Sequence, residues 1–399
     1  MIDASPAIHT LANGTRIISQ TVSGRETAAI AIAWRTGSRS EMKGETGFAH
    51  LAEHILFPDD PDDRAAFDAM GGQINAWSGQ EYTIFYAHVP LLFLYDVLRR
   101  LTCRLCQFTQ ILSEDTLERE RQAIRNEFFS EGDNTLEMAL NRCQGKTQVS
   151  EGISQDVSPE SLKRFISREL HGQSLCVGII AGNLDQKKIL DACAALVDLP
   201  SKRVEPRHSS SEWLSGLHEQ LEGTNPPGIL WLMPIEPRGS QYAKAIALGE
   251  RALCSGLDAP LFRELRERGW AYGIHTTHEA WTDGGYWALQ IVCPSNEIRR
   301  IQSAVEAAVT TAIERLSTTH LDVAWSALNS TAVLENDDIA NLALKFAVDG
   351  LFGSVTKTEP PPRLSVETVR MAFKNSWLRR SRFVLGAQYH PSLYYSKPA

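Results

Sequence analysis

One order of secondary-structure elements occurs twice in this sequence, on either side of a break rich in proline and serine. The break spans residues 204–228 and contains three consecutive serines and an Asn-Pro-Pro-Gly run, which interrupt any hydrophobic periodicity. On each side of it, apolar strands alternate with segments of helical periodicity. Layered domains of helices on sheets have this pattern. We therefore predict an α+β protein with two similar αβ domains, at 1–203 and 229–399, joined by a linker at 204–228.

Hydrophobic periodicity predicts where each half forms strands and helices. In the first half, the predicted strands are 15–20, 28–34, 73–89 and 175–181. The predicted helices there are one that ends before Pro58, and 64–70, 91–108, 113–132, 158–170 and 186–197. In the second half, the predicted strands are 229–233, 271–279, 286–293 and 383–387. The predicted helices there are 241–254, 259–268, 296–316, 319–334, 337–350 and 365–380.

Charge and hydropathy argue against two kinds of partner. The 40 Lys and Arg residues are outnumbered by 48 Asp and Glu residues, for a net charge of −8, whereas a general nucleic-acid binder needs a strongly basic surface. No apolar run reaches the roughly 18 residues of a membrane span. The first residues have neither the basic nor the apolar region of a secretory signal. We expect no nucleic-acid partner, no membrane partner and a cytoplasmic location.

The cysteines agree with a reducing compartment. Seven of them are scattered along the chain without the spacing of a disulfide framework. Cys103 and Cys106 form a C-x-x-C pair, but a zinc ribbon needs a second such pair, and a thioredoxin-like pair would follow a strand. This pair lies inside a segment of helical periodicity. We therefore predict two structural residues on a helix.

Residues 50–54, with the sequence H-L-A-E-H, have the spacing of a zinc site. On a helix, His50 and His54 lie one turn apart on the same face, with Glu53 beside them. Two such imidazoles can bind one Zn²⁺, and the carboxylate between them can take a proton from water. The alternative is a helix with two solvent-exposed histidines. Apolar residues on both sides of the motif argue against it, because polar groups next to a core are costly without partners.

A zinc site of this kind needs a third protein ligand and an open fourth position. In the predicted helix that includes residues 117–129, Glu120 and Glu127 lie two turns apart on one face. One carboxylate can bind the metal while the other orients a ligand or a water molecule. Glu118 is expected to be a surface residue. The spacing alone leaves open which of the two carboxylates binds.

Five segments of the sequence together resemble the pitrilysin-type (M16) metallopeptidases, whose H-x-x-E-H motif is that of the inverzincins. They are residues 11–16, 37–41, 47–57, 71–78 and 117–129. The resemblance implies a LuxS/MPP-like metallohydrolase fold, with mostly antiparallel sheets and helices packed on one face. It also implies that His50, His54 and Glu127 bind Zn²⁺. Glu53 would then be the general base, and Glu120 would support the metal ligands.

The resemblance further implies how a peptide is bound and cleaved. The strand that contains Asn75, Ala76 and Trp77 would pair with an extended substrate by strand addition. Zinc would polarise the scissile carbonyl and lower the pKa of water. Glu53 would take the proton of that water and deliver it to the leaving amine.

A second family feature falls in the second half of the chain. Arg266 and Tyr272 resemble a pair that contacts the substrate backbone and stabilises the developing oxyanion. They are six residues apart, where the family usually has seven. Arg263 and Arg268 therefore stay as alternatives to Arg266.

The residues and the resemblance together predict a zinc-dependent endopeptidase. Because the family encloses its substrate between two halves, a chain of this length is expected to pair with a second copy or with a related M16 subunit. An enclosed chamber would admit short or unfolded peptides, and maturation or leader removal of a ribosomally made peptide is a role that would suit it. The alternatives are a peptidase of general oligopeptide turnover, a docking subunit with little or no activity, and a zinc-dependent hydrolase of another class.

Overall fold

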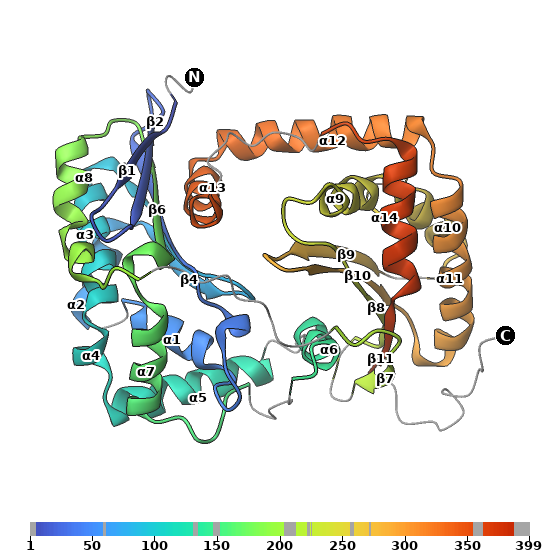
Figure 1. The fold of residues 1–399 in the computed structure, drawn as a ribbon, viewed down its shortest axis with the longest axis horizontal. Helices are drawn as coiled ribbons and strands as arrows, with labels where there is room; N and C mark the ends of the chain where they lie inside the picture. The colour runs from blue at the N-terminus through green and yellow to red at the C-terminus, as the bar shows by residue number, and fades with distance from the viewer. Residues whose placement is uncertain are drawn as a thin grey trace. The chain divides into compact units, whose positions relative to one another are not determined.

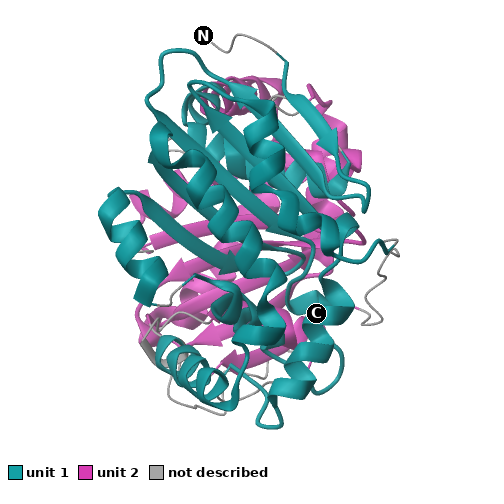
Figure 2. Cartoon of the chain, turned by 90° about the vertical axis from the view of Figure 1, so that its left-hand side faces the viewer, with its two compact units in different colours: residues 1–129, 149–206, 333–358 teal, residues 130–148, 207–332, 359–399 magenta. Residues whose placement is uncertain are grey.

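The computed structural model describes residues 5–58, 61–130, 135–146, 152–202, 213–221, 224, 226–255, 259–270, 273–353 and 362–386. Figure 1 traces the chain, and Figure 2 colours the two compact units into which it divides. Unit 1 comprises Met1–Phe129, Val149–Pro206 and Val333–Thr358. Unit 2 comprises Ser130–Gln148, Arg207–Ala332 and Glu359–Ala399. No helix in the described part of the chain combines the length and apolar character needed to cross a membrane.

Unit 1 is built on a six-stranded sheet with the order β1-β2-β6-β3-β5-β4. Its strands are β1 (Ala7–Thr10), β2 (Arg16–Thr21), β3 (Thr27–Trp34), β4 (Gln73–Ser78), β5 (Thr83–Pro90) and β6 (Leu175–Ala181). β2 and β6 are parallel, and the other neighbouring pairs are antiparallel. β4 ends the sheet, so one side of its backbone has no partner strand among the described residues.

One face of this sheet carries most of the helices of unit 1. They are α1 (Phe48–Leu56), α2 (Pro61–Met70), α3 (Leu94–Cys106), α4 (Phe108–Ile111), α5 (Glu114–Ser130), α7 (Pro159–Glu169) and α8 (Gln186–Ala192). All of them contribute side chains to one hydrophobic core. Short 3₁₀ helices lie between them, namely η1 (Ser38–Ser40), η2 (Leu91–Phe93), η3 (Gly172–Ser174) and η4 (Ala194–Asp198).

The opposite face of the sheet is covered by α13 (Ile339–Phe352), which comes from the second half of the sequence. The central strand β3 explains why a helix fits there. Its alternate residues point to opposite faces, and those that share a core with α13 are alanines, at positions 29, 31 and 33. On β6, a Cβ atom at Gly178 would lie only 2.2 Å from the carbonyl oxygen of Ala343. Small residues therefore allow α13 to approach the sheet closely.

Unit 2 is built on a five-stranded sheet with the order β7-β11-β8-β10-β9. Its strands are β7 (His218–Leu221), β8 (Gly228–Pro234), β9 (Gly273–Ala280), β10 (Gly285–Val292) and β11 (Ser381–Leu385). Helices α9 (Gln241–Leu253), α10 (Pro260–Glu267), α11 (Ile298–Glu314) and α14 (Val366–Leu378) share a core with one face. The short helix η5 (Ser295–Glu297) precedes α11, and α12 (Thr318–Asp337) contains the boundary between the units. The other face packs against α6 (Thr135–Cys143), from the first half of the sequence.

The two sheets share one pairing pattern. β7-β11-β8-β10-β9 of unit 2 corresponds to β2-β6-β3-β5-β4 of unit 1, with the single parallel pair at the same position. In both units a helix follows the central strand, α1 after β3 and α9 after β8. The prediction of an α+β protein with two similar domains is therefore confirmed. Each sheet also has one helix, α13 or α6, on the face opposite its other helices. The prediction had helices packed on one face only.

Three details differ from the sequence-based expectations. The predicted linker at 204–228 contains β7, and its residues 204–212 lie outside the described residues. The helix α6 was not predicted. Each unit contains one helix from the other half of the sequence. A division of the chain into 1–203 and 229–399 does not include this arrangement, and that division stays a prediction.

The C-x-x-C pair lies on α3, as its helical periodicity indicates. The Sγ of Cys106 donates a hydrogen bond to the carbonyl oxygen of Ala195 at 3.2 Å. Burial raises the pKa of Cys106 to about 11, with smaller contributions from Cys103 and Asp198. A thiol with so high a pKa is a poor nucleophile at neutral pH, and all seven cysteines are free thiols.

Candidate metal centre

The helix α1 positions the central cluster of the site. Gly47 precedes it with a φ of +83°, and a Cβ atom there would lie 2.5 Å from the carbonyl oxygen of Gly152, so only glycine fits this turn. Since glycine has no side chain to cap the helix, Glu41 supplies the acceptor: its Oε1 lies 3.0 Å from the backbone nitrogen of Ala49. The helix stops at Phe57, before Pro58.

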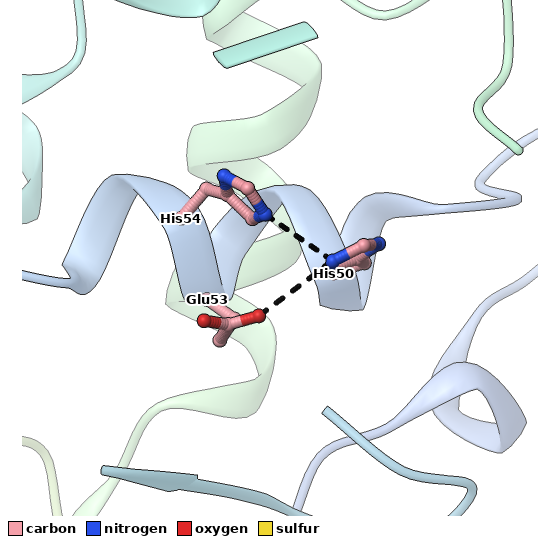
Figure 3. A group of neighbouring side chains, drawn as sticks. All are labelled: His50, Glu53 and His54. Carbon is pink, nitrogen blue, oxygen red and sulfur yellow. Dashed lines mark hydrogen bonds and ion pairs between the residues drawn. The ribbon is translucent and has the colours of Figure 1, made fainter. Parts of the chain in front are cut away.

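One face of α1 is buried in the core, through Phe48, Leu51, Ile55 and Leu56 among others. The two histidines lie on the remaining side, where His50 is 38% exposed and His54 14%. Figure 3 shows that His50, Glu53 and His54 point toward one another. The Nε2 atoms of the histidines are 3.2 Å apart, and Glu53 Oε2 lies 3.8 Å from His50 Nε2. These three side chains form a cluster with the spacing of metal ligands.

Helix α5 adds Glu127 to the two histidines. Its Oε2 lies 3.5 Å from His50 Nε2 and 3.4 Å from His54 Nε2. Three ligands at 2.0–2.1 Å from a tetrahedral zinc ion would be separated by about 3.3 Å from one another. The three atoms form a triangle with sides of 3.2, 3.4 and 3.5 Å. This set of two nitrogens and one carboxylate oxygen therefore fits Zn²⁺ in chemistry and in spacing.

Glu120, which lies earlier on α5, contacts the other nitrogen of His54. Its Oε2 lies 3.3 Å from His54 Nδ1, and its Oε1 pairs with Arg119 at 2.8 Å. Burial acts to raise the pKa of Glu120, but the hydrogen bonds with His54 and Arg119 outweigh it and lower that pKa. The ionised carboxylate accepts the Nδ1–H of His54. In the neutral imidazole, this leaves the lone pair on His54 Nε2, toward His50 and Glu127.

Glu53 is buried beside the histidines. Burial raises its pKa above the ordinary value, although the nearby imidazoles act to lower it. For Glu127, in contrast, the hydrogen bond with His50 is the main reason that its pKa is lowered. The site thus holds two carboxylates with pKa values shifted in opposite directions. Glu53 is suited to carry a proton, and Glu127 is suited to stay ionised.

Supporting residues that the sequence reasoning missed hold the segment before α1. Arg168 of α7 makes two contacts with the carboxylate of Glu45, at 2.8 and 2.7 Å. Glu45 in turn accepts a hydrogen bond from the backbone nitrogen of Met42 at 2.8 Å. Arg119 and Glu41 were also missed. Glu41 lies in the segment 37–41 that carries the family resemblance, but the pattern does not reveal that its side chain caps a helix eight residues later.

The predicted peptide-binding residues lie on the edge strand β4. Asn75 is exposed, Ala76 is half-buried and Trp77 is 41% exposed. The Trp77 ring packs edge-on against Tyr82, with ring centroids 5.1 Å apart. Asn75 accepts a hydrogen bond from the backbone nitrogen of Ala76. Helix α1 packs against this strand, so the free edge of β4 neighbours the helix that carries the histidines.

The predicted clamp residues belong to unit 2. Arg266 is exposed on α10 and lies over the ring of Phe262 at 5.5 Å. Arg268 pairs with Glu264 at 2.5 Å and also lies over the Trp270 ring. Arg263 is exposed on the same helix. Tyr272 lies outside the described residues, so the role of the Arg–Tyr pair stays a prediction.

Two family models match the chain, one in each half. Residues 16–153 match the model described as Insulinase (Peptidase family M16), and residues 156–326 match the Peptidase M16 inactive domain. The second description agrees with the sequence of α9, which occupies in unit 2 the place of α1 and contains no histidine.

Curated relatives carry related names. An uncharacterized zinc protease of Streptomyces coelicolor is 26% identical over 320 residues, covering 73% of this chain and 68% of the relative. Another, of Mycobacterium tuberculosis, is 27% identical over 325 residues and covers 72% of this chain and 70% of the relative. A third, of Rickettsia felis, is 21% identical over 364 residues, covering 84% of each chain.

Solved structures show the same fold. A protease from Helicobacter pylori superimposes with a TM-score of 0.81 at 15% identity, over 96% of this chain and 99% of that one. The first half of the periplasmic protease PqqL from Escherichia coli superimposes with a TM-score of 0.68 at 15% identity, over 96% and 92%.

Proposed function

The chain belongs to the M16 peptidase family, and from this premise we propose that it is a zinc endopeptidase whose centre is formed by α1 and α5. The observation that carries the proposal is the triangle of His50, His54 and Glu127 atoms, which matches the spacing of zinc ligands. The names of the relatives, all zinc proteases, support the same metal. We assign these three residues as the zinc ligands.

In the proposed reaction, each residue of the cluster has a separate task. Zinc bound there would act as a Lewis acid toward the scissile carbonyl and would lower the pKa of water. Glu53 accepts the proton of the attacking water and delivers it to the leaving amine. Its burial favours this, because a carboxyl with a raised pKa holds the transferred proton more readily. Glu120 keeps His54 in the tautomer that leaves Nε2 free.

We further propose that the substrate adds as a strand to the free edge of β4. Main-chain hydrogen bonds would hold an extended peptide along Asn75, Ala76 and Trp77, and the exposed Trp77 ring offers one wall for a substrate side chain. On the family resemblance, Tyr272 would donate to the developing oxyanion and Arg266, or alternatively Arg263 or Arg268, would contact the substrate backbone.

We propose that a second chain completes the site, as a homodimer or as a heterodimer with a related M16 subunit. The match to the first half of PqqL supports this, because that half is one part of a longer protein. An enclosed site would select short or unfolded peptides, and maturation of a ribosomally made peptide is the role proposed here. The seven free thiols agree with a cytoplasmic location.

Replacement of Glu53 by Gln tests the catalytic role. Since the side-chain amide of the variant cannot take a proton, we expect it to keep its zinc but to lose at least about 100-fold in cleavage of an unstructured peptide. Metal content and cleavage rate are measured on the same samples, with Glu118→Gln on the exposed side of α5 as the matched control. Cleavage by Glu53→Gln at the wild-type rate would show that the mechanism is wrong. Wild-type protein that binds zinc but cleaves no peptide would favour the docking subunit.

A further inference from the structure

A cavity of about 520 Å³ lies beside the edge strand β4 of unit 1. Its lining comes from the C-terminal end of α2, the turn at 71–72, the first residues of β4, and Tyr86 on the neighbouring strand β5. None of the proposed zinc ligands lines it. Its volume is in the range of pockets that hold a small ligand or a large side chain.

The position of the cavity connects it to the edge of the sheet. Residues 73–75 of β4 line the cavity, and β4 is paired on one side only among the described strands. A peptide that adds to the free edge of β4 must pass along these residues. In a strand, side chains two positions apart project to the same face, about 7 Å from each other. One side chain of such a peptide would therefore reach the cavity, while its neighbours would not.

The chemistry of the lining favours a cation. Asp68 is exposed, and no donor or cation in the described part of the chain contacts its carboxylate. Two aromatic residues, Phe67, which is 8% exposed, and half-buried Tyr86, are also among the lining residues. No Lys or Arg is among the lining residues. A long basic side chain can lay its apolar stem against the apolar part of the lining and place its charged end at the carboxylate.

The other classes of side chain fit less well. A Glu or Asp side chain would meet the like charge of Asp68. An apolar side chain could contact the apolar part of the lining but would make no use of the carboxylate. Gln73 and Asn75, the remaining polar residues of the lining, are neutral and do not reverse this preference.

We propose that this cavity is a side-chain pocket that selects lysine or arginine at one position of a peptide bound along β4. The proposal rests on the peptidase function and adds its substrate class, namely peptides with a basic residue at a fixed distance from the cleaved bond. Asp68 is the residue that sets the selection.

The test uses sets of three peptides that differ at a single position, which carries Lys, norleucine or Glu. One such set is made for each position on both sides of the cleaved bond. Binding to zinc-loaded Glu53→Gln protein is measured by fluorescence anisotropy, and cleavage by wild-type protein is measured as kcat/KM. We expect one position at which Lys is preferred over Glu by about tenfold or more. Asp68→Asn should bring this ratio close to one, and Asp68→Lys should reverse it.

The control is Asp191→Asn, an exposed residue of α8 outside the cavity lining, which should keep the wild-type ratio. Equal Tm values for the variants exclude a folding effect. An unchanged ratio in Asp68→Lys protein that still binds peptides would overturn the pocket and leave the peptidase function standing. A ratio that depends on Asp68 in binding, with no cleavage by wild-type protein, would support the pocket and contradict the peptidase function. No binding of any peptide would contradict both.

Discussion

The carboxylate of Glu120 decides which nitrogen of His54 is free to bind a metal. It accepts from Nδ1 at 3.3 Å and is itself held by Arg119. A ligating histidine that is fixed in this way binds its metal more tightly than a histidine that becomes restricted to one tautomer and one rotamer only on binding. With His54 as a zinc ligand, as proposed, this contact would help to set the zinc affinity.

We predict that Glu120→Gln weakens zinc binding by about 10- to 100-fold. The neutral amide still reaches His54 but is a weaker acceptor, and it loses the ion pair with Arg119. The measurement is a competition titration against a chelator of known affinity, with Glu118→Gln as the control. Equal affinities for wild type and Glu120→Gln would show that this contact does not orient His54.

Glu41 acts on the same helix from its N-terminal end. Because its Oε1 supplies the cap that Gly47 cannot, we predict that Glu41→Ala lowers the free energy of unfolding by about 0.5–2 kcal/mol. Glu41→Gln keeps an acceptor and should lose less. Urea unfolding followed by circular dichroism measures both. An equal loss in the two variants would mean that the acceptor is not what stabilises α1.

At this scale, the sequence allowed prediction of some contacts and not others. His50, Glu53 and His54 lie on one helix, whose geometry is local, so their spacing alone was enough to place them together. Glu41 caps α1 across a loop, and Arg168 reaches Glu45 from a helix more than 100 residues away. No periodicity in the sequence records contacts of this kind.

Among the elements, strands and helices with a strong apolar pattern were predicted within a few residues, as β3 and α7 show. The strand β7 was missed because its sequence His-Glu-Gln-Leu has one buried residue, Leu221, and its strand form depends on pairing with β11. The helix α6 was missed because it is short and packs on a sheet from the other half of the chain. Both depend on partners that are distant in sequence.

The packing of α13 on β6 leads to a prediction about stability. Because a Cβ atom at Gly178 would lie 2.2 Å from the Ala343 oxygen, Gly178→Val must push α13 away from the sheet. We expect a loss of at least about 1–3 kcal/mol in the free energy of unfolding. Gly284→Ala, whose added Cβ would have its nearest neighbour at 3.7 Å, is the control. Wild-type stability of Gly178→Val in urea unfolding would contradict the close packing.

For the whole molecule, the packing of α13 on the sheet of unit 1 means that the first half of the sequence does not contain a complete unit. Without α13, the face that holds Ile18, Ala31 and Ile180 would be exposed to water, and an exposed apolar patch favours aggregation. We predict that a fragment of residues 1–206 is unstable or insoluble, and that fusion to residues 333–358 restores a cooperative unfolding transition. Thermal unfolding of the two fragments measures this. A fragment 1–206 that folds as stably as the fusion would contradict the prediction.

The late position of α13 in the sequence also affects how unit 1 folds during synthesis. A ribosome adds about 5–20 residues per second, so α13 leaves it on the order of ten seconds after β6 has been made. During that interval the sheet of unit 1, on whose other face α1 and α5 pack, has one apolar face without its helix. Unit 1 can therefore be completed only after the C-terminal half of the chain has been made. Any chaperone that assists the nascent chain before residue 339 emerges would bind this face.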